Sequence, residues 1–120
     1  MTVAIRALAE RLIGEEMVHY RQAREADDTR AAWTALERAH IISQPHFGHH
    51  LFNHWSMLGY AFHLRDWREM LGQLFRLALA PVGALSGWIP VGNTGRSDVS
   101  AFAPMKVPDD LAHFIKDIKG

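Results

Sequence analysis

The sequence predicts an all-α protein of two antiparallel helical hairpins, followed by a long irregular C-terminal segment and a short final helix. Apolar residues recur at steps of three and four along residues 5–80, which is the spacing that lines one face of a helix. The breaks between these runs are short, so sequential helices are expected to be antiparallel neighbours. Beyond Pro81 glycine and proline become frequent and the helical period is lost.

The first two helices are predicted over residues 5–26 and 29–44. Asp27, Asp28 and Thr29 form a polar break between them and can cap a helix start. The inward faces are expected to carry Ile5, Leu8, Ala9, Leu12, Glu16, His19 and Ala23 in the first helix, and Ala32, Trp33, Leu36, Ala39 and His40 in the second. This second run loosely follows the rhythm of a tetratricopeptide helix, so a closed four-helix bundle and a tetratricopeptide-like pair of hairpins both remain open.

The third and fourth helices are predicted over residues 45–64 and 66–80, where Pro45 suits a first turn and Asp66 a cap. Their inward stripes are expected to be Phe47, Leu51, Trp55, Leu58 and Phe62, and Trp67, Met70, Leu71, Leu74, Leu77 and Ala78. Residues 81–108 are predicted to be irregular and anchored by Val99, Phe102 and Met105. A short helix over 109–119, with Leu111, Phe114, Ile115 and Ile118 inward, completes a single domain over 1–120.

Composition narrows the classes of function. The 120 residues include 13 basic and 13 acidic side chains without a block of one sign, which disfavours binding to nucleic acid or to an anionic membrane. The apolar runs are too short or too interrupted for a membrane span or a signal peptide, so a cytoplasmic location is expected. Cysteine is absent, which excludes disulfides and thiolate metal sites. Any metal must therefore be bound by imidazole and oxygen.

Histidine is the unusual residue, because the chain contains eight and six of them lie between His40 and His63. His50 and His54 are one turn apart on the third helix, at an inward or half-inward position, and two imidazoles at this spacing can bind one metal ion. His49 and His63 fall on the opposite arc, and we expect them, with His113, to face solvent.

Carboxylates accompany two of the histidines in a Glu-x-x-His pattern, which places both side chains on one helix face. The copies are Glu16 with His19 and Glu37 with His40. Dinuclear carboxylate proteins of the ferritin type use such pairs, with glutamates from other helices, and Glu69 on the fourth helix is a candidate. The pattern is short, however, and such pairs also occur as simple ion pairs or hydrogen bonds, which is the interpretation we favour for Glu16 and His19.

Two further segments contain residue types that are common at functional sites. Gln73 and Arg76 stand a turn from Glu69 and are expected to orient or neutralise a ligand. The run Gly92-Asn93-Thr94-Gly95 lacks the lysine of a phosphate loop and predicts a tight turn with Asn93 or Gly95 at positive φ. Trp33, Trp55 and Trp67 are expected to pack in the core or at its rim.

An ordered series of short motifs resembles a bacterial family known only as a domain of unknown function. The motifs extend from about Ala32 to Leu111 and comprise Leu36-Glu37-Arg38-Ala39-His40 with Gln44, His50 and His54 before Met57-Leu58, Glu69 with Gly72-Gln73 and Arg76, Pro90 with Gly92-Asn93-Thr94-Gly95, Val99-Ser100 and Pro104-Met105. The chain has Arg96 and Asp98 where the family pattern tends to carry glycine and asparagine. The resemblance therefore does not imply a functional role for the backbone or the side-chain amide of the turn at Gly92–Gly95.

The resemblance implies no known activity, but its motifs single out His40, His50, His54, Glu69, Gln73 and Asn93. Together with the spacing, it favours one transition metal ion held by His40, His50 and His54 with Glu37 or Glu69. Zinc, iron, manganese and copper all suit such ligands, and no organic cofactor is predicted.

Two alternatives remain at this stage. The first is an interaction module that binds a protein or peptide in a groove between hairpins, with the histidines individually paired, or a homodimer that buries the stripe on the third helix. The second is an enzyme in which His40 acts as a base oriented by Glu37.

Overall fold

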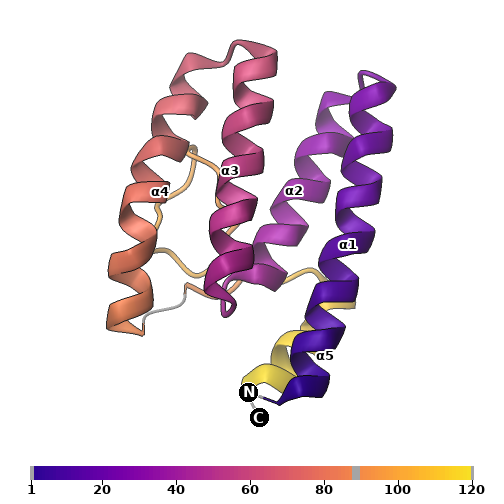
Figure 1. Ribbon diagram of the computed structural model, residues 1–120, viewed down its shortest axis with the longest axis vertical. Helices are drawn as coiled ribbons and strands as arrows, with labels where there is room; N and C mark the ends of the chain where they lie inside the picture. Colours follow the sequence, from indigo (N-terminus) through magenta and orange to yellow (C-terminus); the bar gives the residue numbers. More distant parts are fainter. Residues whose placement is uncertain (1, 88–89, 120) are drawn as a thin grey trace.

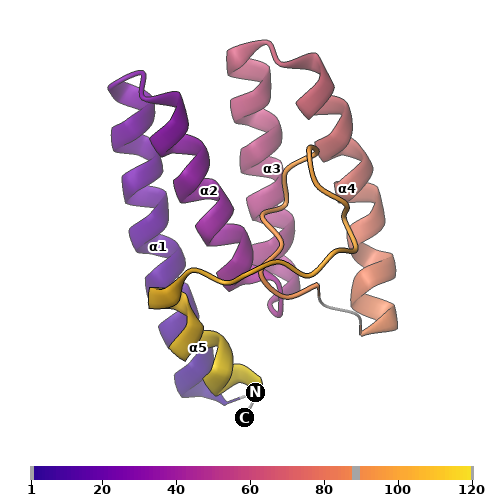
Figure 2. The ribbon, with the colours of Figure 1, turned by 180° about the vertical axis from the view of Figure 1, so that it is seen from behind.

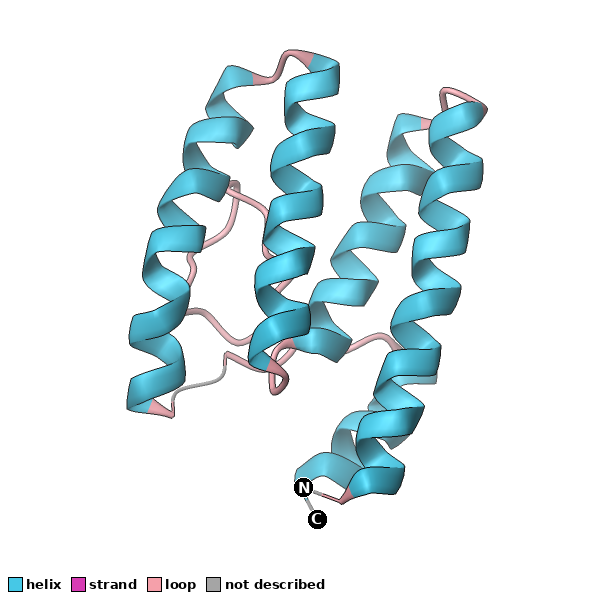
Figure 3. Cartoon of the chain, viewed as in Figure 1, coloured by secondary structure: helices cyan, strands magenta, loops and turns pink. Residues whose placement is uncertain are grey.

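The protein is all-α, with no strand in the part of the chain that the structure describes (Figures 1 and 3). The computed structural model describes residues 2–87 and 90–119, with side chains as far as residue 115. The helices are α1 (Val3–Glu25), α2 (Thr29–Ser43), α3 (Phe47–Leu64), α4 (Trp67–Ser86) and α5 (Asp109–Lys119). The predicted hairpins, irregular segment and final helix are therefore confirmed.

The two hairpins stand side by side and do not close into a ring. Figure 1 shows α4, α3, α2 and α1 following one another across the molecule, and close packing joins α1 to α2, α2 to α3 and α3 to α4. The arrangement is therefore an open bundle of sequential helices, because a closed four-helix bundle would also pack α1 closely against α4. Segment 90–108 lies over the face of α3 and α4 that is turned to the viewer in Figure 2, and it leads to α5, which lies beside the start of α1. None of the described helices is long and apolar enough to cross a bilayer.

Side-chain caps begin three of the helices. The side chains of Thr2, Asp28 and Asp66 accept hydrogen bonds from the backbone amides of Ile5, Ala31 and Glu69. These bonds satisfy amide groups that lack partners inside the first helical turn. The caps at Asp28 and Asp66 agree with the sequence prediction and fix where each hairpin turns.

The main core lies between α1, α2 and α3. Tyr60 of α3 is fully buried, and its ring packs edge-on against Tyr20 of α1 and Trp33 of α2, with centroids 5.4 and 5.0 Å apart. Leu36 and Met57 are buried in the same cluster. The predicted inward face of α2 is confirmed, because Ala32, Trp33, Leu36, Ala39 and His40 are all buried.

Most residues of the inward faces predicted for α3 and α4 do not face inward, although Met70 of α4 packs against the main core. The aromatic residues Phe47, Trp55 and Phe62 of α3 are exposed, as are Trp67, Leu71, Leu74 and Ala78 of α4. The buried residues are instead Asn53, His54, Met57, Tyr60 and Ala61 of α3, and Glu69, Gln73, Arg76 and Ala80 of α4. Periodicity locates an apolar stripe but does not say which side it faces, and here the inner face is polar because its side chains bond one another. Trp55 and Trp67 are thus surface residues, whereas Trp33 is in the core as expected.

The boundary between α4 and the irregular segment also differs from the prediction. Helix α4 continues through the exposed Pro81 to Ser86 and ends at Gly87, whose φ of 74° terminates it. Proline removes one internal hydrogen bond, and at a solvent-facing position the freed carbonyl can bond water. Phe102 and Met105, two of its three predicted anchors, are exposed, whereas Asn93 is buried and its side chain donates to the carbonyls of Ser100 and Ala103.

Helix α5 packs against α1 through the residues that its period predicts. Leu111, Phe114 and Ile115 are buried with Ala9 and Ile13 of α1. The fourth predicted inward residue, Ile118, lies outside the described side chains. Arg38 of α2 ties this end of the chain to the hairpin, because its guanidinium donates to Asp110 and, at 2.9 Å, to Glu16.

Candidate metal centre

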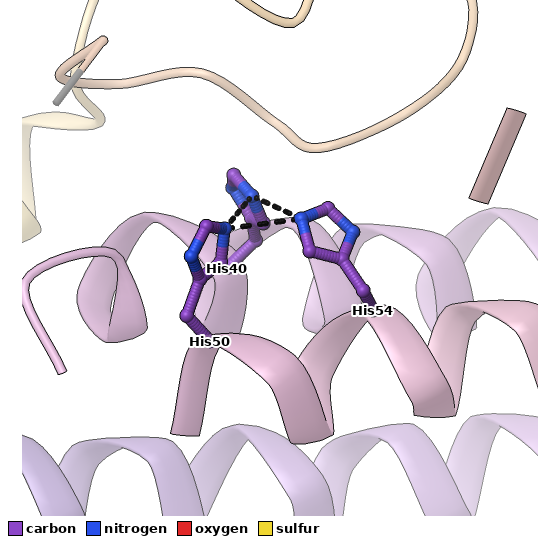
Figure 4. A group of neighbouring side chains, drawn as sticks. All are labelled: His40, His50 and His54. Atoms are coloured by element: carbon purple, nitrogen blue, oxygen red, sulfur yellow. Dashed lines mark hydrogen bonds between the residues drawn. The ribbon is translucent and has the colours of Figure 1, made fainter. Parts of the chain in front are cut away.

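Three histidines from two helices converge on one point. His40 lies near the end of α2, and His50 and His54 lie one turn apart on α3. Figure 4 shows their Nε2 atoms pointing toward one another. The edges of this triangle measure 3.2 Å from His40 to His54, 3.2 Å from His50 to His40 and 3.0 Å from His54 to His50. Among the described residues, this trio is the one group with ligand atoms close enough to share a metal ion.

His40 is oriented by the loop that follows α4. Its Nδ1 donates to the backbone carbonyl of Asn93 at 2.7 Å, so that nitrogen carries the ring proton. The loop is rigid here, because the Asn93 side chain donates to the carbonyls of Ser100 and Ala103 and accepts from the amide of Gly95. Gly95 has the positive φ that the sequence predicts, 81°, and a Cβ there would lie 2.5 Å from Cδ2 of His40.

His54 is oriented from α4 by Gln73. Two acceptors, Oε2 of Glu69 at 2.9 Å and the carbonyl of Gly95 at 2.8 Å, fix the Gln73 amide nitrogen. The amide oxygen therefore faces Nδ1 of His54, at 2.7 Å, and must accept its proton. The sequence analysis expected Gln73 to orient or neutralise a ligand next to Glu69, and the structure shows its side chain bonded to both Glu69 and His54.

Fixed tautomers leave bare nitrogen lone pairs at the centre of the triangle. His40 and His54 both carry their proton on Nδ1, so neither Nε2 atom can donate to the other across 3.2 Å. His50 can donate to one of them at most. Two tetrahedral zinc ligands with bonds of about 2.05 Å would be about 3.3 Å apart, close to the edges of this triangle. The three nitrogen atoms are therefore placed so that they could hold a shared cation.

Burial keeps the three imidazoles neutral. It lowers the pKa values of His50 and His54 to about 4, with the neighbouring His54 adding to the effect on His50, and it lowers the pKa of His40 well below its ordinary value. The nearby Arg76 guanidinium lowers the pKa of His40 and His54 further. Neutral imidazole is the form that binds metals, so the ligands need not lose a proton near neutral pH.

The structure does not bring Glu37 or Glu69 into the triangle. Both carboxylates instead pair with the guanidinium of Arg96, whose Nε lies 2.7 Å from Oε1 of Glu69 and whose Nη1 lies 3.4 Å from Oε2 of Glu37. Burial favours the neutral form of Glu69, but hydrogen bonds from Arg96, Gln73 and the Ser97 amide outweigh it and lower the pKa. For Glu37 burial prevails and raises the pKa. Glu69 supports the histidines through Gln73, and the expected pairing of Glu37 with His40 is replaced by the Asn93 carbonyl.

The triangle opens onto a cavity of about 330 Å³. All three histidines lie in its wall, and the rest of the lining is mostly apolar, including Phe47, Leu79 and Ala80. Arg76 is also in the wall, and its guanidinium donates to the carbonyls of Arg96 and Val99. A cation held by three imidazoles would thus have room beside it for a water molecule or a small ligand.

The remaining histidines lie apart from this cluster. His63 and His113 are exposed as predicted, whereas His49 is half-buried with Nε2 3.8 Å from Glu10. His19, predicted on the inward face of the first helix, is exposed, and its Nδ1 lies 3.5 Å from Oε1 of Glu16, the partner that the sequence predicts. His46 is buried at the start of α3, and its Nε2 has no partner among the described residues.

Arg96 and Gly95 are the residues of this region whose roles the sequence does not disclose. Arg96 joins Glu37 and Glu69 and stacks on Trp33, with its guanidinium carbon 3.6 Å from the ring centroid. An arginine in a glycine-rich loop gives no local signal of such contacts. Gly95 is recognisable as a turn residue, but its close approach to His40 depends on a partner 55 positions away in the chain.

Comparisons with known proteins identify a family but no activity. A family model described as "Protein of unknown function (DUF3703)" matches residues 7–115. No curated protein and no solved structure matches the chain. The matched range contains all three histidines and the loop that orients them. The chain therefore belongs to the DUF3703 family of proteins of unknown function.

Proposed function

We propose that the protein binds one divalent transition metal ion through the Nε2 atoms of His40, His50 and His54. The observation that carries the proposal is the convergence of nitrogen atoms whose protons are directed away by Asn93 and Gln73. Buried polar groups are normally paired, and lone pairs that face one another are satisfied when a cation lies between them. Histidine ligands oriented through their other ring nitrogen are the common arrangement at protein metal sites.

The ligand set favours an ion that accepts imidazole nitrogen. Zinc, copper and iron fit this preference, and three nitrogen ligands leave at least one coordination position for a further ligand. The cavity beside the histidines supplies space for that ligand. An ion with an open position is able to activate water or to bind a small molecule, so a carrier, a sensor and a small metalloenzyme are all consistent with the centre.

The interaction-module alternative expects the histidines to be dispersed and individually bonded. The three central histidines instead share one point, and their outer nitrogens are held by two different elements. Such an arrangement has no evident use in a peptide-binding groove. The metal-binding proposal therefore accounts for more of the buried polar residues than the module does.

Zinc titration of the untagged protein tests the proposal. The wild-type protein should take up one equivalent of zinc in competition with a chromophoric chelator. His54→Ala should lower the affinity by more than about 100-fold, because losing a ligand costs more than the 10–100-fold expected for an outer hydrogen-bond partner. His63→Ala is the matched control, since His63 lies on the same helix but is exposed.

Two results would overturn the proposal. The first is a wild-type protein that takes up none of zinc, copper, iron or manganese. The second is equal zinc affinity in the His54→Ala and His63→Ala variants, which would show that zinc binds outside the histidine triangle. Circular dichroism of each variant ensures that a lost site is not simply a lost fold.

A further inference from the structure

Helices α3 and α4 present a broad apolar surface to the outside. Helix α3 contains no Asp, Glu, Lys or Arg in its 18 residues. On α4, Glu69 and Arg76 are buried, which leaves Arg68 as its exposed charge among Trp67–Ser86. We call the following six residues, each between 53% and 69% exposed, the outer face: Phe52, Trp55, Phe62, Trp67, Leu71 and Phe75.

The outer face is apolar because polar side chains, among them His54 of α3 and Gln73 of α4, take the buried positions of these two helices. His54 and Gln73 point toward segment 90–108, which covers one side of the α3–α4 hairpin (Figure 2). The apolar residues must then occupy the remaining positions of each helix. Phe62 and Trp67 join the two helices at the tip of the hairpin, with ring centroids 6.4 Å apart. At this tip the apolar surface is therefore continuous from α3 to α4.

The size of the outer face exceeds that of an ordinary apolar patch. A fully exposed aromatic or leucine side chain offers about 200 Å², so these six residues together expose roughly 700 Å². The largest apolar patch on a typical monomer is about 300–600 Å², whereas a standard protein interface buries about 800 Å² from each partner. The outer face is thus the size of one side of a stable dimer interface.

We infer that the outer face binds the same face of a second copy of this chain, giving a homodimer in which two α3–α4 hairpins pack together. Two antiparallel helices that meet their own copy about a two-fold axis form a four-helix bundle, in which each apolar face covers the other. Homodimer interfaces are the most apolar class, in keeping with a surface that carries almost no charge.

Charge disfavours a lipid surface as the occupant. Helices that lie on anionic membranes carry several lysines and arginines along their polar face. Here α3 carries none, α4 exposes Arg68, and the whole chain balances 13 basic against 13 acidic residues. The same balance means that two copies do not repel one another through net charge.

Sedimentation equilibrium of the full chain over the micromolar range tests the inference. The wild-type protein should have about twice the chain mass of 13.6 kDa. Trp55→Glu and Leu71→Glu should each give a monomer, because a carboxylate would be buried without a partner in the interface. Val18→Glu is the matched control, since it introduces the same charge at an exposed apolar position of α1 and should remain dimeric.

Three results would overturn the inference. They are a wild-type monomer at all micromolar concentrations, a dimer that persists in both glutamate variants, and a monomer that sediments with anionic vesicles and loses this property in Trp55→Glu. The dimer does not depend on metal binding, so zinc titration of the same variants separates the two proposals. Unchanged zinc uptake in monomeric Trp55→Glu would support both.

Discussion

At the scale of single residues, the site depends on how His40 and His54 are held. Each ring is fixed at Nδ1 by an acceptor that is itself fixed, the Asn93 carbonyl and the Gln73 side chain. Gly95 then closes the loop over His40 without a side chain. The conformation of the loop at Asn93–Gly95 thereby determines the direction in which the Nε2 lone pair of His40 points.

Gly95→Ala should weaken metal binding. The new Cβ would lie 2.5 Å from the His40 ring at a φ of 81°, so the ring or the loop must shift. We expect zinc affinity to fall by at least 10-fold, the range found when the support of a ligand is lost. Gly87→Ala is the control, because its φ is 74° but no atom lies within 4 Å of the new Cβ.

The Gly87→Ala control distinguishes the effect of backbone strain at positive φ from the effect of a new Cβ that contacts His40. Gly87→Ala should cost about 1–2 kcal/mol of stability and leave zinc affinity unchanged. Equal zinc affinity in Gly95→Ala and the wild-type protein would contradict the role given to the loop. Chelator competition measures both variants on the same scale.

Sequence reasoning reached the three histidines because helical spacing is local. His50 and His54 share a face by their separation of four, and His40 lies on the buried stripe of α2. Helical spacing does not show whether the carboxylates of Glu37 and Glu69 join the histidines. Glu37 and Glu69 lie on the correct helices, but Arg96 from the distant loop pairs with both, and no period reveals such a contact.

At the scale of elements, the loop after α4 is bound to both hairpins by Arg96. Its guanidinium reaches Glu37 on α2 and Glu69 on α4 and covers Trp33. In the Arg96–Glu69 pair the Glu69 side chain is 4% exposed and the Arg96 side chain 19%, so the carboxylate is buried and the guanidinium largely so. A buried pair of this kind is costly to break, because the remaining charge keeps its desolvation penalty.

Arg96→Ala should lower the free energy of unfolding by about 3 kcal/mol, since Glu69 would stay buried without its cation. Arg6→Ala is the control, because the Arg6–Glu10 pair has a similar separation of 3.2 Å but is exposed, and should change stability by less than about 0.5 kcal/mol. Urea unfolding followed by circular dichroism measures both. Similar effects of the two substitutions would refute the bridging role of Arg96.

The helices themselves were predictable, whereas the faces of α3 and α4 were not. Capping residues and periodicity give the number and approximate limits of the helices from local sequence. The rule that apolar residues face inward fails for Trp55 and Leu71, because Gln73, Glu69 and His54 satisfy one another's hydrogen bonds inside. Likewise, Pro81 does not end α4, since it lies on the exposed side of the helix.

At the scale of the whole molecule, the histidine cluster makes stability without metal depend on pH. Burial lowers the pKa values of His50 and His54 to about 4, below the value of about 6.5 for an unfolded chain. The unfolded state therefore binds more protons in this window. Stability is fully present above about pH 6.5 and is lost as the pH falls toward 4, by up to about 1.4 kcal/mol per pH unit for each histidine.

Urea unfolding of the metal-free protein between about pH 7 and pH 4 checks this expectation. The double variant His50→Ala, His54→Ala should show a shallower dependence, because two of the groups responsible are removed. A wild-type profile as flat as that of the double variant would mean that these imidazoles titrate normally and are not desolvated.

X-ray absorption spectroscopy of the protein loaded with one equivalent of zinc tests the central claim most directly. Three histidines on one ion predict a first shell of light atoms at about 2.0–2.1 Å, with the outer-shell scattering of three imidazole rings and room for one further light ligand. His54→Ala should remove one ring from this pattern or release the ion. A zinc shell of oxygen atoms without imidazole scattering, or the same spectrum in the variant, would contradict the account.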